Sequence, residues 1–400
     1  MNASLLLTAA LGLILVGLVH VALRRSLRAL QASRPTPPAR LPAMLVIRPV
    51  RGRDPGLVRN AIAALRQRYP GPLETLFVLD DESDPALPIL RQVLRACPDA
   101  NARIVLSGPP RPARTGKLHA MIQGMARARG DAPLVCFADS DTRPTPDLLA
   151  RLAARVTREP DVGAAFAPAV CAERPRTGGD AAYALLLDGV YGPQAAMTLS
   201  IEGALPFIMG QTMVLRREAL DAAGGLEGSE GQLVDDMHIG ARLHAAGWRN
   251  VLIGAPLHIV QRGLSWRDLR GLALRWMIYG RTGIPFWPFN APALGWVAVF
   301  FGAPLLAVLA ALHGDLWSMS LALVATAAVP VSLQRLRRTL GGARLPLRLW
   351  WAPVVTLAML PELYLRALFS RSIQWRGRIY RLDPAGLLRS PTRPMDGSPG

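Results

Sequence analysis

The sequence is almost without lysine and poor in cysteine. Of its 46 basic residues 45 are arginine, and Lys117 is the only lysine. The net charge of +18 invites a nucleic-acid partner, but no helix-turn-helix, zinc-finger or RNA-binding signature is present. Many arginines instead flank apolar segments, where they would meet anionic lipid headgroups. We therefore expect a membrane partner and no nucleic acid.

Two further absences narrow the class of protein. Cys97, Cys136 and Cys171 are odd in number and widely spaced, which indicates a reducing compartment and argues against a zinc site. No G-x-G-x-x-G motif follows the first predicted strand, in residues 48–53, which disfavours a dinucleotide-dependent oxidoreductase.

Long apolar windows are abundant, in keeping with a mean hydropathy of +0.24. About twenty apolar residues span a bilayer core. Residues 4–23 predict an uncleaved N-terminal anchor, and residues 291–312 and 316–333 predict a membrane hairpin. Residues 349–368 form a weaker window with two prolines, Glu362 and Arg366, and we expect this segment either to span the membrane or to lie in its interface.

The arginines also predict orientation. They follow the first window and the hairpin, whereas the hairpin tip has none. The positive-inside bias then places residues 24–290 and 334–348 in the cytoplasm, with the protein multi-pass in the cell (inner) membrane. The basic tail after residue 370 is expected to be cytoplasmic as well.

Between the membrane segments, strand-like and helix-like stretches alternate. We expect an anchor in residues 1–30, a proline-rich linker in 31–42, a folded domain in 43–285, a membrane region in 286–369 and a basic tail in 370–400. Alternation predicts an α/β domain, a mostly parallel sheet with flanking helices. The predicted strands are residues 44–47, 76–79, 104–106, 134–138 and 162–167, and the predicted helices are 57–69, 88–96, 117–129 and 146–156.

Carboxylates follow two of the predicted strands. Asp139-Ser140-Asp141 ends the apolar run 134–138, and Asp80-Asp81 ends the run 76–79. In parallel sheets, ligands bind beyond the carboxyl ends of the strands, so one cleft can collect both pairs. Oxygen-rich sites of this kind suit Mg²⁺ or Mn²⁺ shared with a phosphate-bearing substrate. We expect Asp139 and Asp141 to bind the metal.

Taken together, the motifs resemble those of family 2-type inverting glycosyltransferases with the GT-A nucleotide-sugar-binding fold, and within them the ceramide glucosyltransferase-like, hopanoid-associated branch. The matching stretches lie in residues 43–285 and in the tail: Arg48-Pro49-Val50-Arg51-Gly52, Asp54-Pro55, Arg68-Tyr69-Pro70, residues 80–86, Gly116-Lys117, residues 139–141, Arg216-Arg217, Gly224-Gly225, Asp235-Asp236, Arg275-Trp276 and residues 375–380. One departure is Leu272, where the family pattern has Gln or Arg four residues before the tryptophan.

The resemblance implies roles for these residues. Asp80 or Asp81 contacts the uridine, and Lys117 lies near the nucleotide. Asp236 is the general base, with Asp235 as the alternative. Arg275 meets the diphosphate and Trp276 forms an apolar wall, unless the pair only anchors the chain at the membrane interface. The tail residues fold back over the cleft or touch headgroups; they are Trp375, Arg376 and Arg378.

The sequence thus predicts a membrane-bound, metal-dependent glycosyltransferase that moves a sugar from a UDP-sugar to a hydroxyl of a lipid. A ceramide-like or hopanoid-like acceptor is favoured, and diacylglycerol or a polyprenyl phosphate is the alternative. A non-catalytic basic membrane scaffold is the rival from another class. The identity of the sugar and of the lipid, and the oligomeric state, are left open.

Overall fold

A computed structural model describes residues 3–283 and 286–389, and it divides the chain into two compact units. The first unit takes residues 1–35, 167–205 and 251–368, and the second takes 36–166, 206–250 and 369–400. The residues predicted as one domain, 43–285, are therefore shared between both units. The second unit is thus built from three separate stretches of the sequence, and the C-terminal tail is one of them.

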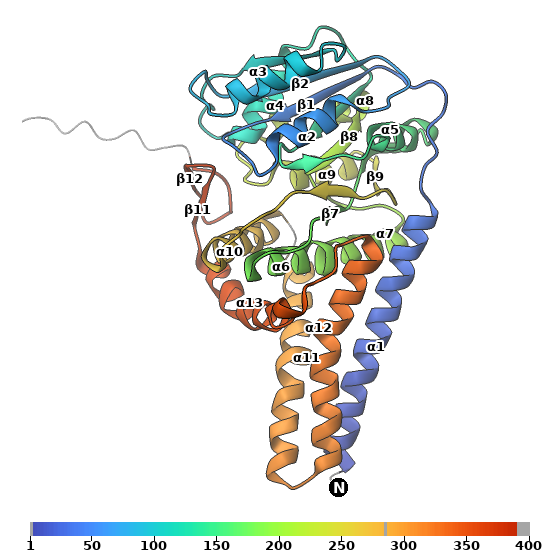
Figure 1. The fold of residues 1–400 in the computed structure, drawn as a ribbon, viewed down its shortest axis with the longest axis vertical. Helices are drawn as coiled ribbons and strands as arrows, with labels where there is room; N and C mark the ends of the chain where they lie inside the picture. The colour runs from blue at the N-terminus through green and yellow to red at the C-terminus, as the bar shows by residue number, and fades with distance from the viewer. Residues whose placement is uncertain (1–2, 284–285, 390–400) are drawn as a thin grey trace, which may run out of the picture. The chain divides into compact units, whose positions relative to one another are not determined.

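The second unit is built on a seven-stranded sheet in the order β3-β2-β1-β4-β8-β6-β9 (Figure 1). Strands β1 to β4 pair in parallel, as the alternation predicts. The unit boundary falls within β9. The strands are β1 (Met44–Pro49), β2 (Leu73–Leu79), β3 (Ala102–Leu106), β4 (Leu134–Ala138), β6 (Val162–Phe166), β8 (Thr212–Arg216) and β9 (Arg249–Leu252).

Helices follow the strands in the predicted order. They are α2 (Leu57–Leu65), α3 (Leu87–Ala96), α4 (Gly116–Ala126), α5 (Leu148–Arg158), α8 (Arg217–Ala222) and α9 (Asp235–Ala245). Helix α2 ends four residues before the predicted Tyr69, because the residue before Pro70 disfavours helical backbone. Helix α4 packs so closely on β1 that a Cβ on Gly124 would lie 2.8 Å from the Ile47 side chain.

Strand β8 is the one that shapes the site. It lies antiparallel between β4 and β6, with Ala138 opposite Thr212. It therefore begins where β4 ends, and Asp139 N donates to Gln211 O at 3.0 Å. The antiparallel insertion brings residues 210–211 to the carboxyl edge of the parallel strands.

The C-terminal segment adds a hairpin to the second unit. Strands β11 (Ser372–Trp375) and β12 (Arg378–Arg381) pair antiparallel around a two-residue turn. Both turn residues have positive φ, 51° at Arg376 and 74° at Gly377, which is the pattern of a type I′ turn. Leu388 N also donates to Gly231 O at 2.8 Å, so the segment beyond the hairpin stays on this unit. Short elements complete the unit: β5 (Thr142–Arg143) and η2 (Glu227–Ser229).

The first unit contains the long apolar helices. Helix α12 (Leu316–Leu340) packs against both α1 (Ala3–Ala32) and α11 (Phe286–Leu312), and the three run side by side in Figure 1. Among the described residues, three helical stretches are long and apolar enough to cross a membrane: 3–32, 316–340 and 347–369. The first part of the predicted window 291–312 has side chains outside those described, and the remaining part of α11, residues 300–312, is apolar. These helices associate the chain with a membrane.

A second group of helices in this unit packs together. It consists of α6 (Gly178–Ala184), the π-helix η1 (Leu185–Tyr191), α7 (Gly192–Glu202), α10 (Trp266–Gly283), the 3-10 turn η3 (Leu347–Leu349) and α13 (Ala352–Phe369). Two apolar clusters join α13 to α6, η1 and α10, through residues such as Ala352 and Leu363. Strands β7 (Ala169–Cys171) and β10 (Leu257–Ile259) pair in parallel beside them.

Candidate active site

The second unit gathers its carboxylates at the carboxyl ends of β1, β2 and β4, as expected for a parallel sheet. Helix α4 begins next to this edge, and α9 begins there too. The site residues of this unit come from seven separate segments of the sequence.

Asp139 and Asp141 leave the tip of β4 on a tightly braced loop. The buried Arg48 guanidinium donates from Nη2 to Asp139 O at 2.7 Å and to Thr142 O at 3.0 Å. The Ser140 hydroxyl between the two carboxylates donates to Asp54. The loop is thus held by its backbone and by Ser140, which leaves the two flanking carboxylates available to a ligand.

Lys117 occupies the centre of the site. It stands on the first turn of α4, whose N-cap Thr115 accepts from Leu118 N at 3.1 Å. Its ammonium lies 2.8 Å from Asp139 Oδ1 and donates to Gly210 O at 3.0 Å. Burial alone would lower the pKa of Lys117, but the nearby aspartates, Asp139 foremost, outweigh burial and raise it. The lone lysine of the chain is therefore charged and links the β4 loop to the start of β8.

Asp235 and Asp236 open α9 on the other side of Lys117. Asp236 Oδ2 accepts from Gly210 N at 2.5 Å and its Oδ1 accepts from Met237 N at 2.9 Å. A Cβ on Gly210 would stand 2.3 Å from Asp236 Oδ2, so only glycine allows this approach. Asp235 is buried, whereas Asp236 keeps part of its side chain exposed. Asp236 is thus the less buried residue of the pair.

The site carries an excess of negative charge. Four carboxylates surround Lys117, and burial raises the pKa of three of them: of Asp141 to about 7, of Asp235 to about 6, and of Asp236. Asp139 and Asp54 add to the shift at Asp141. Among the described residues, no group hydrogen-bonds to the buried Asp141 Oδ1. An orphaned carboxylate oxygen in a negatively charged site fits a divalent cation.

The protein ligands alone would not complete a metal shell. Across residues 3–283 and 286–389, no three His, Cys, Asp or Glu residues form a metal-binding group. Mg²⁺ commonly takes one or two carboxylates and fills the rest of its shell with water and substrate phosphates. Asp139 and Asp141 match that requirement.

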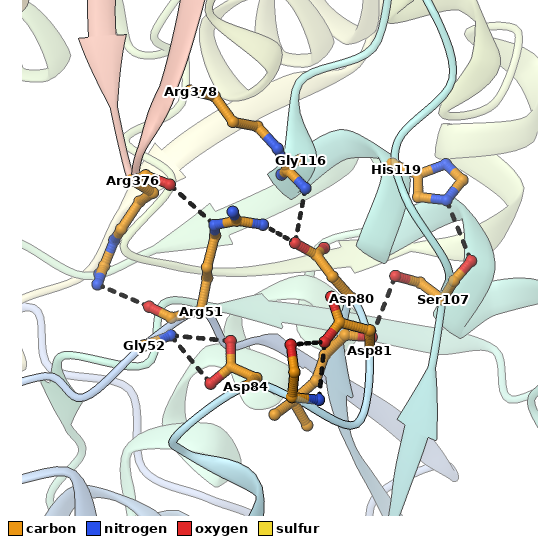
Figure 2. Close-up of polar contacts among 12 residues, drawn as sticks. Arg51, Gly52, Asp80, Asp81, Asp84, Ser107, Gly116, His119, Arg376 and Arg378 are labelled. Atoms are coloured by element: carbon orange, nitrogen blue, oxygen red, sulfur yellow. Dashed lines mark hydrogen bonds and ion pairs between the residues drawn. The ribbon is translucent and has the colours of Figure 1, made fainter.

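Asp80 and Asp81 differ in their surroundings (Figure 2). The buried Asp80 forms ion pairs with Arg51 and with Arg378, the latter at 2.6 Å. Asp81 is exposed and accepts hydrogen bonds from the backbone N–H and the hydroxyl of Ser83. The bond from the hydroxyl is the main cause of the lowered pKa of Asp81. Asp80 is thus already neutralised by two guanidiniums, and Asp81 remains open to a ligand.

The C-terminal hairpin contacts this edge at four points, as Figure 2 shows for its two arginines. Arg376 pairs with Asp54 at 2.5 Å and exchanges bonds with the Arg51 backbone and side chain. Tyr380 Oη accepts from Gly116 N at 3.2 Å. A Cβ on Gly116 would stand 2.1 Å from Arg378 Nη1. The arginines expected from the tail therefore do fold back onto the unit that carries the carboxylates.

A pocket of about 400 Å³ opens beside these contacts. It lies at the ends of β1 and β2, next to Asp81 rather than around Asp139 and Asp236. Its lining is Arg51, Gly52, Arg53, Asp81, Ser83, Asp84, Pro85 and Arg376. Its volume falls in the range of small-molecule sites, and the hairpin forms one of its walls.

Arg275 and Trp276 lie on α10, in the first unit. Trp276 packs against Tyr183 at 5.2 Å between ring centroids and against Tyr191 at 5.6 Å. Leu272, the departure from the family pattern, packs into the same apolar cluster as Trp276. Arg270, two residues before Leu272 and therefore out of register with it, pairs with Glu362 at 2.9 Å. The leucine thus serves packing at this position.

Three residues of the site were given no role from the sequence, although two of them, Arg51 and Asp54, stand in the matching motifs. Asp54 accepts from Arg376 and Ser140, Arg51 binds Asp80, and Gly210 supports Asp236. Asp54 and Arg51 follow directly on β1, and their place after a buried strand is the signal that would have found them. Gly210 gives no such signal, because its importance depends on the antiparallel course of β8.

Comparisons with known proteins agree with this geometry. The sequence model described as Glycosyl transferase family 21 matches residues 5–388. Ceramide glucosyltransferase 3 of Caenorhabditis elegans is 22% identical over 366 residues, 88% of this chain and 75% of that protein. An N-acetylglucosaminyltransferase of Rhizobium meliloti (strain 1021) is 30% identical over 230 residues, 54% of this chain and 51% of that protein.

A solved structure shares the fold. The mannosyltransferase PcManGT from Pyrobaculum calidifontis, in complex with GDP-Man and Mn²⁺, superposes with a TM-score of 0.53 at 20% identity. The match covers 92% of this chain and 99% of that one. The fold is therefore the α/β GT-A fold, as the sequence predicts.

Proposed function

Because the chain belongs to glycosyl transferase family 21 and is a glycosyltransferase, we propose that it transfers a sugar from a UDP-sugar to a hydroxyl group of a membrane lipid. The observation that carries the proposal is the group of four aspartates around Lys117 at the end of β4. Such a group supplies what the reaction needs: a place for a diphosphate with its cation, and a carboxylate beside it to accept a proton.

The donor would bind along the carboxyl edge of β1, β2 and β4. The pocket beside Asp81 suits the nucleoside, and its open carboxylate suits a hydrogen bond to uracil or ribose. Asp139 and Asp141 would hold Mg²⁺ or Mn²⁺, which, when bound, offsets the charge that develops on the leaving diphosphate. Lys117 fixes Asp139 in position and adds a second positive charge near the leaving group.

Asp236 would act as the general base. Its oxygens accept from Gly210 N and Met237 N, which orients the carboxylate. It would take the proton of the acceptor hydroxyl as the oxygen attacks the anomeric carbon on the face opposite the diphosphate, and the configuration there would invert. Asp235 remains the alternative base. Its burial favours a supporting role, since Asp235 Oδ1 accepts from the backbone N–H of Asp236 at 3.0 Å.

The hairpin would complete the donor site. Arg376 and Arg378 stand within ion-pair distance of Asp54 and Asp80, one on each side of the β1 edge. Two guanidiniums so placed suit a diphosphate, which Arg binds in a bidentate manner. Arg275 and Trp276 would serve the diphosphate and the acceptor from α10, as the resemblance implies.

The acceptor would be a ceramide-like or hopanoid-like lipid, with diacylglycerol or a polyprenyl phosphate as the alternative. The membrane helices of the first unit and the similarity to ceramide glucosyltransferase 3 support a lipid over a soluble sugar. A purely structural membrane scaffold would not need carboxylates with raised pKa values around a buried lysine.

The test is a transfer assay with purified full-length protein in vesicles. UDP-sugars would be offered with vesicles that contain ceramide, a hopanoid polyol, diacylglycerol or a polyprenyl phosphate. We expect UDP release that depends on a hydroxylated lipid and on Mn²⁺ or Mg²⁺, with a glycolipid detected by mass spectrometry. Equal release without any lipid acceptor, or a product only with polyprenyl phosphate, would contradict the favoured acceptor.

A further inference from the structure

The segment that contains helix α13 is long and apolar enough to cross the membrane, but its exact placement depends on where its two ends lie. Its two ends can be placed by following the chain. The side of the membrane on which each end lies follows from the unit to which the neighbouring segment belongs.

The start of α13 lies on the side of the second unit. The chain leaves that unit at residue 250 and reaches α11 through β10 and α10. Helices α11 and α12 pack against each other and are joined by only three residues, 313–315, so they form an antiparallel pair. Such a pair returns the chain to the side it left. The segment 341–351 between α12 and α13 is therefore on the side of the second unit.

The end of α13 lies on that same side. Only two residues separate Phe369 from the hairpin, and the hairpin is an integral part of the second unit. Arg376 pairs with Asp54, Arg378 pairs with Asp80, and Leu388 N donates to Gly231 O. A helix with both ends on one side of a bilayer does not cross it.

The exposed face of α13 is mostly apolar nonetheless, with Glu362 and Arg366 as its charged members. Its exposed residues recur at helical spacing and form one stripe, about 27 Å long at 1.5 Å per residue. We call it the α13 stripe; its apolar members are Trp351, Val354, Val355, Ala358, Leu365 and Phe369. Phe369 is 81% exposed. The opposite face of α13 packs inside the first unit, where Leu357 and Leu363 are buried.

The charges around the stripe suit a membrane surface. Glu362 lies on the exposed side and pairs with Arg270 and Arg366. Arginines also flank the helix at positions 348 and 371, and Trp350 and Trp351 are half-exposed at its start. Charge pairs of this kind are costly in the hydrocarbon core, whereas Trp and Arg are enriched at the headgroup level. We propose that α13 lies in the plane of the membrane, with the α13 stripe at the boundary between the headgroups and the acyl chains of the leaflet that faces the second unit.

This placement goes beyond the proposed reaction and does not depend on it. It gives the protein a surface for lipid in the one leaflet that the second unit faces. Continuity with α12 puts the stripe at the bilayer, and the flanking arginines favour a leaflet rich in anionic lipid.

Thiol labelling tests the two ends. Single cysteines would replace Arg344, Arg371 and His313 in full-length protein without its native cysteines, reconstituted in vesicles with one orientation. An impermeant reagent should label Arg344→Cys and Arg371→Cys from the same side, and His313→Cys from the other. Labelling of positions 344 and 371 from opposite sides would overturn the proposal.

Depth measurements test the stripe itself. An environment-sensitive fluorophore would be attached to Val355→Cys and to Leu365→Cys, and quenched by lipids with quenchers at known depths. In-plane α13 predicts the same shallow depth at both positions, whereas a spanning helix predicts a difference of about 15 Å for ten residues. Leu305→Cys, exposed on α11, is the deep control. Absence of quenching at both stripe positions would mean that a protein partner covers α13, which also overturns the proposal. Neither readout requires sugar transfer, so failure here is distinct from failure of the proposed function.

Discussion

At the scale of single residues, the site is organised around one lysine among 45 arginines. The Lys117 ammonium contacts Asp139 and the backbone of Gly210, and it is close enough to Asp235 and Asp236 for their charges to raise its pKa. A compact ammonium suits this position, because the planar guanidinium of Arg is larger and requires a fork of acceptors. The residue thereby ties the proposed metal side of the site to the proposed base.

The first prediction concerns the metal. Asp141→Asn should abolish sugar transfer, because it removes half of the carboxylate pair that holds the cation. Turnover would be measured across a Mn²⁺ and Mg²⁺ titration, with thermal unfolding as the control for folding. The orphaned Asp141 Oδ1 needs no partner to keep the loop in place, so we expect unfolding to change little. Wild-type activity in excess chelator would contradict a metal role.

The second prediction concerns the base. Asp236→Asn should lower kcat by about 10²–10⁴-fold, the usual contribution of a positioned base, with little change in donor affinity. Asp235→Asn is the matched variant one residue away. If Asp235→Asn is the crippling change and Asp236→Asn is mild, the two roles are exchanged.

The third prediction follows from burial of the same pair. Burial raises the pKa of Asp236, and burial together with Asp236 raises the pKa of Asp235 to about 6. A base works only when deprotonated, so activity should fall as the pH drops through this raised pKa. The acidic limb of the kcat profile should therefore lie at a higher pH than the ordinary carboxyl pKa of about 4. Asp235→Asn removes a neighbouring negative charge and should move the limb to lower pH. A limb near pH 4 in the wild type would contradict the assignment.

At the scale of elements, two strands decide the site. Strand β8 runs antiparallel and delivers Gly210 to Asp236, and the β11–β12 hairpin delivers its arginines to the β1 and β2 edges. Arg376 adopts a left-handed backbone conformation with φ of 51°, which is uncommon for a residue other than glycine. Its pairing with Asp54 helps to offset the cost of that conformation.

A glycine substitution tests the hairpin. Gly116→Ala would place a methyl group against the Arg378 guanidinium and displace it from Asp80. If the hairpin completes the donor site, the KM for the UDP-sugar should rise about tenfold, equivalent to about 1.4 kcal/mol of lost binding, while kcat changes little. Gly130→Ala is the control, since its Cβ would meet open space. An unchanged KM in Gly116→Ala would remove the hairpin from the donor site.

These elements also show where prediction from sequence succeeds. The strand at 134–138 has the predicted bounds, because five successive apolar residues between Pro133 and Asp139 are typical of a buried strand. The hairpin was not predicted as strands, although its two-residue turn ends in glycine, since β12 reads Arg-Ile-Tyr-Arg and lacks a buried face. The carboxylate pairs at positions 80–81 and 139–141 were found because they follow buried strands. Asp54 stands in a matching motif but received no role, because its partner Arg376 comes from the hairpin, and Gly210 was not found, because its role depends on β8.

At the scale of the whole molecule, the fold and the family agree with the sequence, and the division into two units does not follow the predicted domain bounds. Periodicity identifies helices and strands one at a time. It carries no information on which of them pack together, and residues 167–205 and 251–283 pack with the membrane helices.

The last prediction concerns the side of the membrane. From the arginine distribution we propose that the second unit lies in the cytoplasm, where nucleotide sugars are made. Thr36→Cys, exposed in the linker after α1, should resist an impermeant thiol reagent in intact cells, and His313→Cys should react. His313 is preferable to Gly314, whose φ of 66° disfavours any side chain. Labelling of Thr36→Cys in intact cells would invert the topology and separate the site from its donor.

The course of β8 has a consequence for biosynthesis. Strand β4 emerges from the ribosome long before its neighbour β8, and the whole segment 167–205 of the other unit is made in between. Until residue 216 has been synthesised, one edge of β4 lacks its partner, and an unpaired edge of a buried strand is prone to aggregate. The hairpin is made later still, after α11, α12 and α13. The nascent chain should therefore depend on chaperones or on early membrane insertion to protect β4, and no fragment that ends before residue 381 should bind donor as the full chain does.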